Sequence, residues 1–237
     1  MSDRVLIIIP AHNEQQSIVD VIERLRSVVP KFERVVVNDG STDLTGQLLA
    51  DMGEKQLRLI SNLGYGQALQ TGLKYALARD FDVIVTMDAD GQHQPKDVPR
   101  LVQALQESSA DMIIGSRFSE GRPYNTPIGP RLGQLMFSHL TRHLLGHRIF
   151  DTSSGFKALR ARTCEVIVDA AFMDFHIETI VKLSLANFKI IELPVDVLER
   201  TSGRSMHSIV SVFNYPLKTI LLTMAAIMDA IVIRRAR

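Results

Sequence analysis

Two aspartates two residues apart, Asp88 and Asp90, are the side chains of this chain best suited to bind a metal ion. They follow an apolar, partly β-branched run, Val83–Met87, which is typical of a buried strand. In an extended segment residues i and i+2 point the same way, so both carboxylates and the amide of Gln92 can meet at one point. Such hard oxygen ligands suit Mg²⁺ or Mn²⁺. A solvated aspartate-rich turn is the alternative interpretation, but the position after an apolar strand, where open α/β sheets bind ligands, favours a metal site.

Polar residues also follow two earlier apolar runs. Asn13 and Glu14 come after the first run, and Asp39 comes after the second. Acceptors at successive strand ends suit a nucleoside, because they can bind the N–H groups of a base or the hydroxyls of ribose. For Asp39 an Asx turn with a helix cap is an equally good interpretation, and Asp43 fits a cap. The first run is followed by neither Gly-x-Gly-x-x-Gly nor a P-loop, which argues against a dinucleotide-binding protein or a simple NTPase.

The elements that must position these residues alternate along the chain between strands and helices. The spacing predicts strands at Val5–Ile9, Val35–Val37, Leu57–Ile60, Val83–Met87, Met112–Ile114 and Ile190–Val197. It predicts helices at Ser17–Val29, from after Asp43 to about Met52, from after Gly66 through Ala78, at Pro95–Glu107 and from Phe175 onward. This order predicts an α/β fold with right-handed crossovers and a largely parallel sheet, whose polar strand ends converge at one edge.

Composition limits the function classes. The chain has 237 residues, enough for one well-buried domain, and its 27 Lys and Arg against 26 Asp and Glu argue against general binding of nucleic acid. A single cysteine, Cys164, excludes a disulfide framework and a thiolate metal cluster, and its default interpretation is a buried thiol in a reducing compartment. We expect no signal peptide at the start of the chain and no membrane-spanning helix.

Five motifs, in this order, resemble those of the family-two inverting glycosyltransferases, and within that family the polyprenol-phosphate sugar synthases. They are Ile9-Pro-Ala-His-Asn-Glu14, Val37-Asn-Asp-Gly-Ser-Thr-Asp43, Asn62-Leu-Gly-Tyr-Gly66, Met87-Asp-Ala-Asp-Gly-Gln-His-Gln-Pro95 and Gly115-Ser-Arg-Phe118. The resemblance implies a glycosyltransferase-A fold, a Rossmann-like sheet flanked by helices, and a nucleotide-diphosphate sugar as donor. It places the nucleotide against Pro10, Ala11, Asn13, Glu14, Asp39 and Asp88, and a divalent metal on Asp88, Asp90 and Gln92.

The resemblance also assigns arginines to phosphate groups. Arg117 follows a predicted strand, Arg131 lies where a loop meets a helix, and Arg200 and Arg204 flank a glycine. Guanidinium groups suit phosphate oxygens, although a solvated surface charge is the default for any single arginine. With Asp90, Arg117 and Arg200 are the expected catalytic residues. The family often has a lysine where this chain has Met206, so Arg204 is the expected substitute.

The segment from Asp151 to Lys157 resembles the family's acceptor and sugar side. Asp151 and Ser154 are expected to contact the acceptor, and Gly155 to permit a close backbone approach. A tight turn with a helix cap is equally compatible with these residue types. If the acceptor is a hydroxyl group, the candidate general bases are Glu178 and Asp174, although Glu178 also suits a helix N-terminus.

The last thirty residues form a separate expected segment, 208–237, after a catalytic domain at 1–207. Apolar residues recur there at helical spacing, Pro216 interrupts them, and three arginines lie near the end. An amphipathic helix on a membrane with anionic headgroups fits this pattern. A helix packed on the domain, or on another copy in a homo-oligomer, fits it about as well.

The function that the resemblance implies is metal-assisted inverting transfer of one sugar from a nucleotide-diphosphate sugar to a polyprenyl phosphate. The expected location is cytoplasmic, peripheral to the inner face of the membrane. Three alternatives stay open. They are a hydroxyl acceptor in polysaccharide or glycolipid synthesis, a nucleotidyltransferase, and a sugar-nucleotide-binding protein without catalysis.

Overall fold

The computed structural model describes residues 3–118, 138–139, 141–143, 148–168, 175–198 and 224. Several sequence predictions lie outside these residues: those for Arg131, Asp174, Arg200 and Arg204, and nearly all of the tail at 208–237.

The described residues form a seven-stranded sheet with the strand order β3-β2-β1-β4-β6-β5-β7. Its strands are β1 (Val5–Ala11), β2 (Glu33–Asn38), β3 (Gln56–Arg58), β4 (Val83–Thr86), β5 (Met112–Ser116), β6 (Lys157–Arg160) and β7 (Ile190–Pro194). The neighbours β3, β2, β1 and β4 pair in parallel, as do β5 and β7. The predicted α/β fold with a largely parallel sheet is therefore confirmed.

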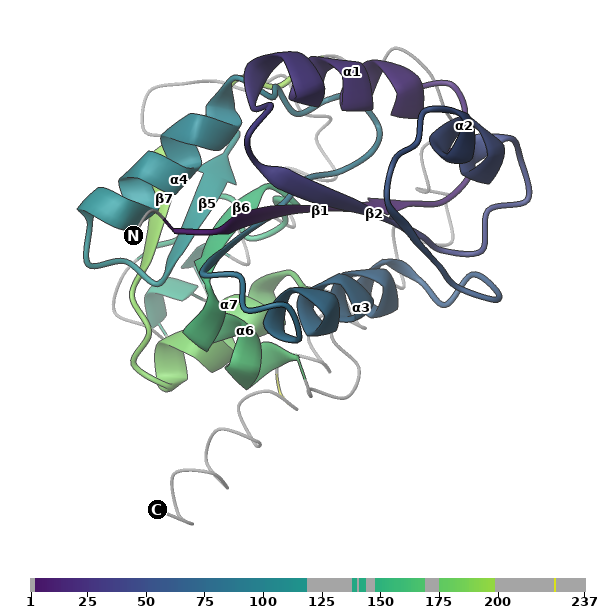
Figure 1. The fold of residues 1–237 in the computed structure, drawn as a ribbon. Coiled ribbons are helices and arrows are strands. Elements are labelled where there is room, and N and C mark those ends of the chain that lie inside the picture. The colour runs from purple at the N-terminus through teal and green to yellow at the C-terminus, as the bar shows by residue number, and fades with distance from the viewer. Residues whose placement is uncertain are drawn as a thin grey trace.

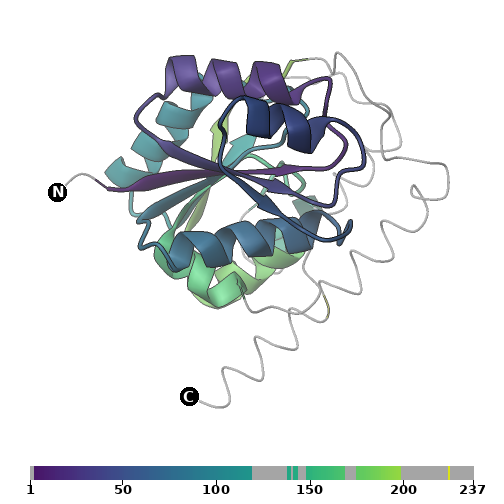
Figure 2. The same ribbon diagram turned by 45° about the vertical axis from the view of Figure 1, so that its right-hand side comes forward.

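Helices cover both faces of the sheet, giving three layers (Figures 1 and 2). One face carries α1 (Ile18–Val28), α2 (Thr45–Asp51) and α4 (Asp97–Glu107); the other carries α3 (Tyr65–Leu77), α6 (Ala161–Ile167) and α7 (Ile177–Leu185). Each face has its own apolar core, because alternate residues of the buried strands point to opposite sides: Ile7 and Ile9 pack toward α1, and Leu6 and Ile8 pack toward α3.

Strand β6 and helix α6 were not predicted from the sequence. Strand β6 runs antiparallel to both of its neighbours, β4 and β5, and lies between them. Its sequence is Lys-Ala-Leu-Arg, with a charged residue at each end, so it lacks the apolar run by which the other strands were recognised. It inserts one antiparallel strand into the middle of an otherwise parallel sheet.

Three strands end earlier than predicted, and one of these differences affects the site. Strand β3 ends at Arg58 instead of Ile60. Strand β4 ends at Thr86, and Asp88 and Asp90 lie in the turn that follows it. The argument from alternation along an extended strand was therefore wrong for this pair, because the chain has already left the strand. Strand β7 ends at Pro194 instead of Val197.

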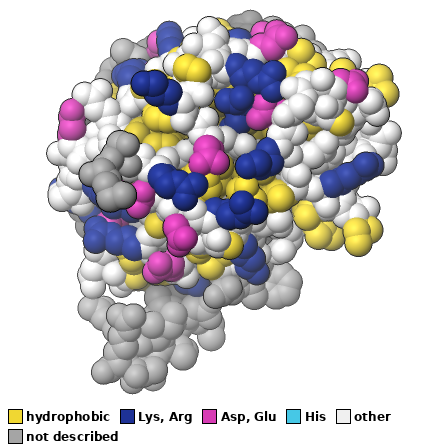
Figure 3. Space-filling model, in the orientation of Figure 1, with side chains coloured by type: hydrophobic (Ala, Val, Ile, Leu, Met, Phe, Trp, Pro, Cys, Tyr) yellow, Lys and Arg dark blue, Asp and Glu magenta, His cyan; other side chains and the backbone are white. Residues whose placement is uncertain are grey.

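On the face of the molecule shown in Figure 3, Lys and Arg side chains lie among Asp, Glu and apolar side chains. In the part of the chain that the structure describes, no helix combines the length and the apolar character needed to cross a bilayer.

Candidate functional site

The loops after β1 and β2 are joined by the side chain of Asn13. Its Oδ1 accepts the backbone N–H groups of Thr42 at 2.9 Å and Asp43 at 3.3 Å, and its own N–H donates to the hydroxyl of Ser41 at 3.0 Å. Asn13 has a positive φ of 56°, a conformation that asparagine adopts more readily than most residues. The predicted nucleotide residue Asn13 therefore also builds the loop that would receive the nucleotide.

Asp39 connects the loop after β2 to the loop after β3. The side chain is buried, and its two carboxylate oxygens accept the N–H groups of Leu63 at 2.8 Å and Gly64 at 2.9 Å. Its backbone carbonyl lies 2.7 Å from Nδ1 of His12. These contacts cross between separate loops, so neither oxygen of Asp39 serves the local cap that was the alternative interpretation. The predicted cap is Asp43, which accepts both the N–H and the hydroxyl of Thr45 at the start of α2.

The other predicted nucleotide residues lie at the same edge. Pro10 and Ala11 are buried in the last two positions of β1. Glu14 lies just beyond them, where its Oε2 accepts the hydroxyl of Ser17 at 2.8 Å and its N–H donates to Thr45 at 2.8 Å. The structure thus brings together the residues predicted to face a nucleotide.

Asp88 and Asp90 occupy the turn after β4, beside this edge. The hydroxyl of Tyr65 donates to Oδ1 of Asp88 at 3.0 Å, and Nδ1 of His93 lies 3.8 Å from Oδ2. Oδ1 of Asp90 accepts the N–H of Gln92 at 3.0 Å. Burial of the Tyr65 hydroxyl, and then the charge of Asp88, raise the pKa of Tyr65 well above its usual value, so the hydroxyl stays a donor.

Gly155 lies directly against the carboxylate of Asp88. A Cβ added to Gly155 would come within 2.5 Å of both carboxylate oxygens and 2.7 Å of the Tyr65 hydroxyl. The carbonyl of Gly155 also accepts a hydrogen bond of 2.7 Å from the hydroxyl of Thr86, which is the last residue of β4. The sequence analysis expected a close backbone approach at Gly155, and in the structure Asp88 and Tyr65 make that approach.

The turn after β4 also contacts the segment that follows β7. The N–H of Leu198 donates to the carbonyl of Gln92 at 2.9 Å, the side-chain amide of Gln92 lies 3.4 Å from the carbonyl of Leu198, and His93 forms a β-bridge with Val197. The turn is thereby fixed to the chain two residues before Arg200.

The donor chemistry of the turn fits a divalent metal. Asp88, Asp90 and Gln92 offer carboxylate and amide oxygens, which Mg²⁺ and Mn²⁺ prefer. Within the described residues, no cluster of three or more His, Cys, Asp and Glu side chains is placed to hold a metal ion. Two carboxylates with open positions suit an ion that completes its coordination with water and with the phosphates of a bound nucleotide.

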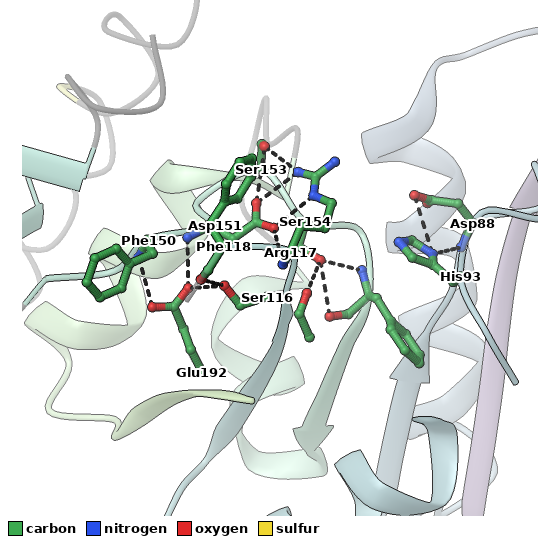
Figure 4. Close-up of polar contacts among 12 residues, drawn as sticks. Asp88, His93, Ser116, Arg117, Phe118, Phe150, Asp151, Ser153, Ser154 and Glu192 are labelled. Carbon is green, nitrogen blue, oxygen red and sulfur yellow. Dashed lines mark hydrogen bonds and ion pairs between the residues drawn. The ribbon is translucent and has the colours of Figure 1, made fainter. Parts of the chain in front are cut away.

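Arg117 and Asp151 form an ion pair in which Asp151 is buried and Arg117 is partly exposed (Figure 4). Nε and the backbone N–H of Arg117 donate to Oδ2 of Asp151 at 2.8 and 2.9 Å, and Nη2 donates to Oδ1 and to Ser153, both at 2.8 Å. Burial alone would raise the pKa of Asp151, but the hydrogen bonds and charge of Arg117 outweigh it and lower that pKa. In this geometry the carboxylate of Asp151 orients Arg117, which favours that role over the predicted contact with an acceptor or a sugar.

Glu192 supports this pair from β7. Its Oε1 accepts the N–H of Asp151 at 2.7 Å and the hydroxyl of Ser116 at 2.8 Å, and its Oε2 accepts the N–H of Phe150 at 2.8 Å (Figure 4). Burial raises the pKa of Glu192 despite these donors. Glu192 was not among the predicted site residues, although a glutamate inside an apolar strand is a signal that could have identified it.

Ser154 and Lys157 are buried and hold the same segment in place. The hydroxyl of Ser154 donates to the carbonyl of Gly115 at 2.7 Å, which favours a structural role over the predicted phosphate contact. Nζ of Lys157 donates to the carbonyls of Ser154 and Phe175, the latter at 2.7 Å. Burial lowers the pKa of Lys157 to about 8, against the opposing charges of Glu178, Asp88 and Asp151.

Glu178 lies in the first turn of α7. It is buried, and its Oε1 accepts the N–H of His176 at 3.0 Å. This contact fits the role at a helix N-terminus that the sequence analysis kept open beside the general base. The other candidate base, Asp174, is outside the described residues.

Sequence comparison relates the whole arrangement to known proteins. Residues 6–167 match the model of glycosyl transferase family 2. An undecaprenyl-phosphate mannosyltransferase of Micrococcus luteus is 34% identical over 215 residues, which are 86% of this chain and 88% of that protein. A polyprenol monophosphomannose synthase of Mycolicibacterium smegmatis is 33% identical over 218 residues, covering 87% and 82%. A dolichol-phosphate mannosyltransferase of Pyrococcus furiosus is 30% identical, covering 90% and 61%.

Comparison with solved structures supports the fold. Glucosyl-3-phosphoglycerate synthase from Mycobacterium tuberculosis, in complex with Mn²⁺, UDP-glucose and phosphoglyceric acid, matches with a TM-score of 0.69. The match covers 95% of this chain and 80% of that one at 19% sequence identity. The predicted glycosyltransferase-A fold is thereby confirmed. The family match over residues 6–167, by itself, shows that this chain belongs to glycosyl transferase family 2.

Proposed function

We propose that this glycosyltransferase moves one sugar, with inversion, from a nucleotide-diphosphate sugar to a polyprenyl phosphate, assisted by Mg²⁺ or Mn²⁺. The observation that carries the proposal is the position of Asp88 and Asp90. Their turn lies between the loop built by Asn13 and Asp39 and the segment that contains the ion pair of Arg117 with Asp151. The names of the relatives from Micrococcus and Mycolicibacterium support a polyprenyl phosphate as acceptor.

On the donor side, the proposal assigns the base and ribose to the edge formed by Pro10, Ala11, Asn13, Glu14 and Asp39. Asp88 and Asp90, with Gln92, would hold the metal, which when bound supplies a positive charge that offsets the charge developing on the departing diphosphate. Because these side chains are already hydrogen-bonded in place, they can fix the direction of the donor before the reaction. Positioning of this kind can contribute roughly 7–11 kcal/mol to lowering a barrier.

On the acceptor side, a lipid phosphate is already anionic at neutral pH, so it needs cations more than a general base. Arg117 is held by Asp151 and Ser153, and one nitrogen of its guanidinium points away from Asp151 (Figure 4). A phosphate would therefore meet an arginine that is already oriented, which reduces the entropy lost on binding. Arg131, Arg200 and Arg204 remain proposed phosphate contacts.

A lipid acceptor also requires contact with a membrane. We propose that the protein acts in the cytoplasm at the inner face of the membrane, with the segment 208–237 as the contact. Deleting 209–237 is expected to move the protein from the membrane fraction to the soluble fraction after cell lysis. Unchanged partitioning would favour the alternative, a helix packed on the domain or on another copy.

Incubating the protein with labelled nucleotide sugars, Mn²⁺ or Mg²⁺ and undecaprenyl phosphate tests the transfer itself. The expected product extracts into organic solvent and releases its sugar in mild acid, because a glycosyl phosphate is acid-labile. A labelled product that resists mild acid would indicate a hydroxyl acceptor. Binding of nucleotide sugar with no release of nucleoside diphosphate, with every donor and acceptor tried, would contradict catalysis.

A further inference from the structure

The loop Asn62–Gly66 contacts two of the carboxylates of the proposed donor site, Asp39 and Asp88. Its backbone N–H groups at Leu63 and Gly64 hold Asp39, and the hydroxyl of Tyr65 holds Asp88. Tyr65 is also the first residue of α3. A single short loop therefore fixes Asp39, at the proposed nucleotide-binding edge, and Asp88, in the turn after β4.

The side chain of Tyr65 has little freedom to turn away from Asp88. Its ring stacks on the ring of His176, with centroids 6.0 Å apart and planes inclined by 11°. Its hydroxyl lies over Gly155, where an added Cβ would come within 2.7 Å of the oxygen. The contacts with His176 and Gly155 thus keep the hydroxyl of Tyr65 within 3.0 Å of Oδ1 of Asp88.

We propose that Tyr65 is a positioning residue for the metal: by holding Oδ1, it fixes the orientation in which the carboxylate of Asp88 would bind the cation. The inference rests on the proposed function, since it requires a metal at Asp88 and Asp90. A phenol suits this task because it is a neutral donor, which orients the carboxylate and leaves its negative charge in place. A carboxylate that is already oriented loses less side-chain entropy when the ion binds.

Replacing Tyr65 with phenylalanine tests this, since Tyr65→Phe keeps the ring and its stacking on His176 and removes only the donor. The affinity for Mn²⁺ is measured by electron paramagnetic resonance of the free ion. The affinities for UDP and GDP are measured by calorimetry with and without Mn²⁺. We expect Mn²⁺ binding to weaken roughly tenfold, the effect of one hydrogen bond to a charged group. Nucleotide binding should weaken only in the presence of Mn²⁺.

Tyr75→Phe is the matched control, because Tyr75 lies on the same helix with its ring against Arg79, 5.2 Å from the ring centroid to the guanidinium carbon. This variant should bind Mn²⁺ as the wild type does.

Unchanged Mn²⁺ affinity in Tyr65→Phe would overturn the inference. An equal loss of nucleotide affinity with and without Mn²⁺ would also overturn it, because it would indicate a merely structural role. If Asp90→Asn leaves Mn²⁺ binding intact, the proposed metal site fails as well. If Asp90→Asn loses Mn²⁺ binding and Tyr65→Phe keeps the wild-type Mn²⁺ affinity, the inference about Tyr65 is overturned and the proposed metal site stands.

Gly155→Ala provides a second test through the same carboxylate. The added Cβ would collide with both oxygens of Asp88, so the carboxylate must move from the direction that Tyr65 gives it. We expect a loss of Mn²⁺ affinity of roughly tenfold or more, with nucleotide affinity in the absence of metal retained. Wild-type Mn²⁺ affinity in Gly155→Ala would show that the direction of Asp88 is unimportant and would overturn the inference.

Discussion

The proposed donor edge, which here includes the turn of Asp88 and Asp90, and the segment around Asp151 both contain buried or half-buried carboxylates, but they hold them differently. At the donor edge, Asp39 and Asp88 accept hydrogen bonds from neutral donors, two backbone N–H groups and a tyrosine hydroxyl. In the other segment, the guanidinium of Arg117 binds both oxygens of Asp151.

This difference assigns different tasks to the two regions. A neutral donor fixes the direction of a carboxylate while its charge stays available to a cation or to a ligand N–H group. A guanidinium offsets the charge of the carboxylate, and the carboxylate in turn fixes the orientation of the arginine side chain. We therefore infer that the donor edge is organised to bind charge, whereas Asp151 is organised to orient Arg117.

The largest effect is expected at the donor edge, from Asp90→Asn. This substitution removes a negative ligand of the proposed metal, which we expect to lower turnover by a factor on the order of a thousand, because metal assistance is worth several kcal/mol. The rate is measured with labelled nucleotide sugar. The unfolding temperature should stay near that of the wild type, and substantial remaining turnover would contradict metal-assisted departure of the diphosphate.

The next effect is expected on stability, from Arg117→Leu. Asp151 is fully buried and the Arg117 side chain is 25% exposed, so the substitution leaves a carboxylate buried without its cation. We expect the free energy of unfolding in urea to fall by about 3 kcal/mol. Arg24→Leu is the control, since it breaks an exposed pair with Asp20 on α1 and should cost less than about 1 kcal/mol. Equal effects of the two substitutions would remove the distinction drawn between the regions.

The smallest effect is a pH dependence of the same pair. Because the pKa of Asp151 is lower in the folded protein than in the unfolded chain, its ionised form stabilises the fold above about pH 4, the ordinary pKa of aspartate. This contribution is lost as the pH falls through the lowered pKa. The stability difference between wild type and Asp151→Asn should therefore be constant from pH 5 to 7 and shrink below about pH 4, measured by urea unfolding. A difference that does not change with pH would contradict the ion pair.

Much of the proposed donor site could be located from the sequence, because its residues lie next to the strands that position them. Asn13, Asp39 and Asp88 each follow an apolar run that ends at the same edge of the sheet, and parallel strands bring such ends together. The acceptor side was predicted less well. Ser154 and Asp151 have residue types that suit ligand contact, and only their burial and partners favour a structural role.

The sequence by itself determined the fold class, the family motifs and the residues of the proposed donor edge, since periodicity and spacing act over a few neighbouring residues. Tertiary structure alone decided that Tyr65 holds Asp88, that Gly155 lies against that carboxylate, and that Arg117, Asp151 and Glu192 form one network. It also placed the antiparallel strand β6 between β4 and β5. The physical reason is that these contacts join residues separated by 23 to 77 positions, and no local pattern specifies which distant partner a residue will find.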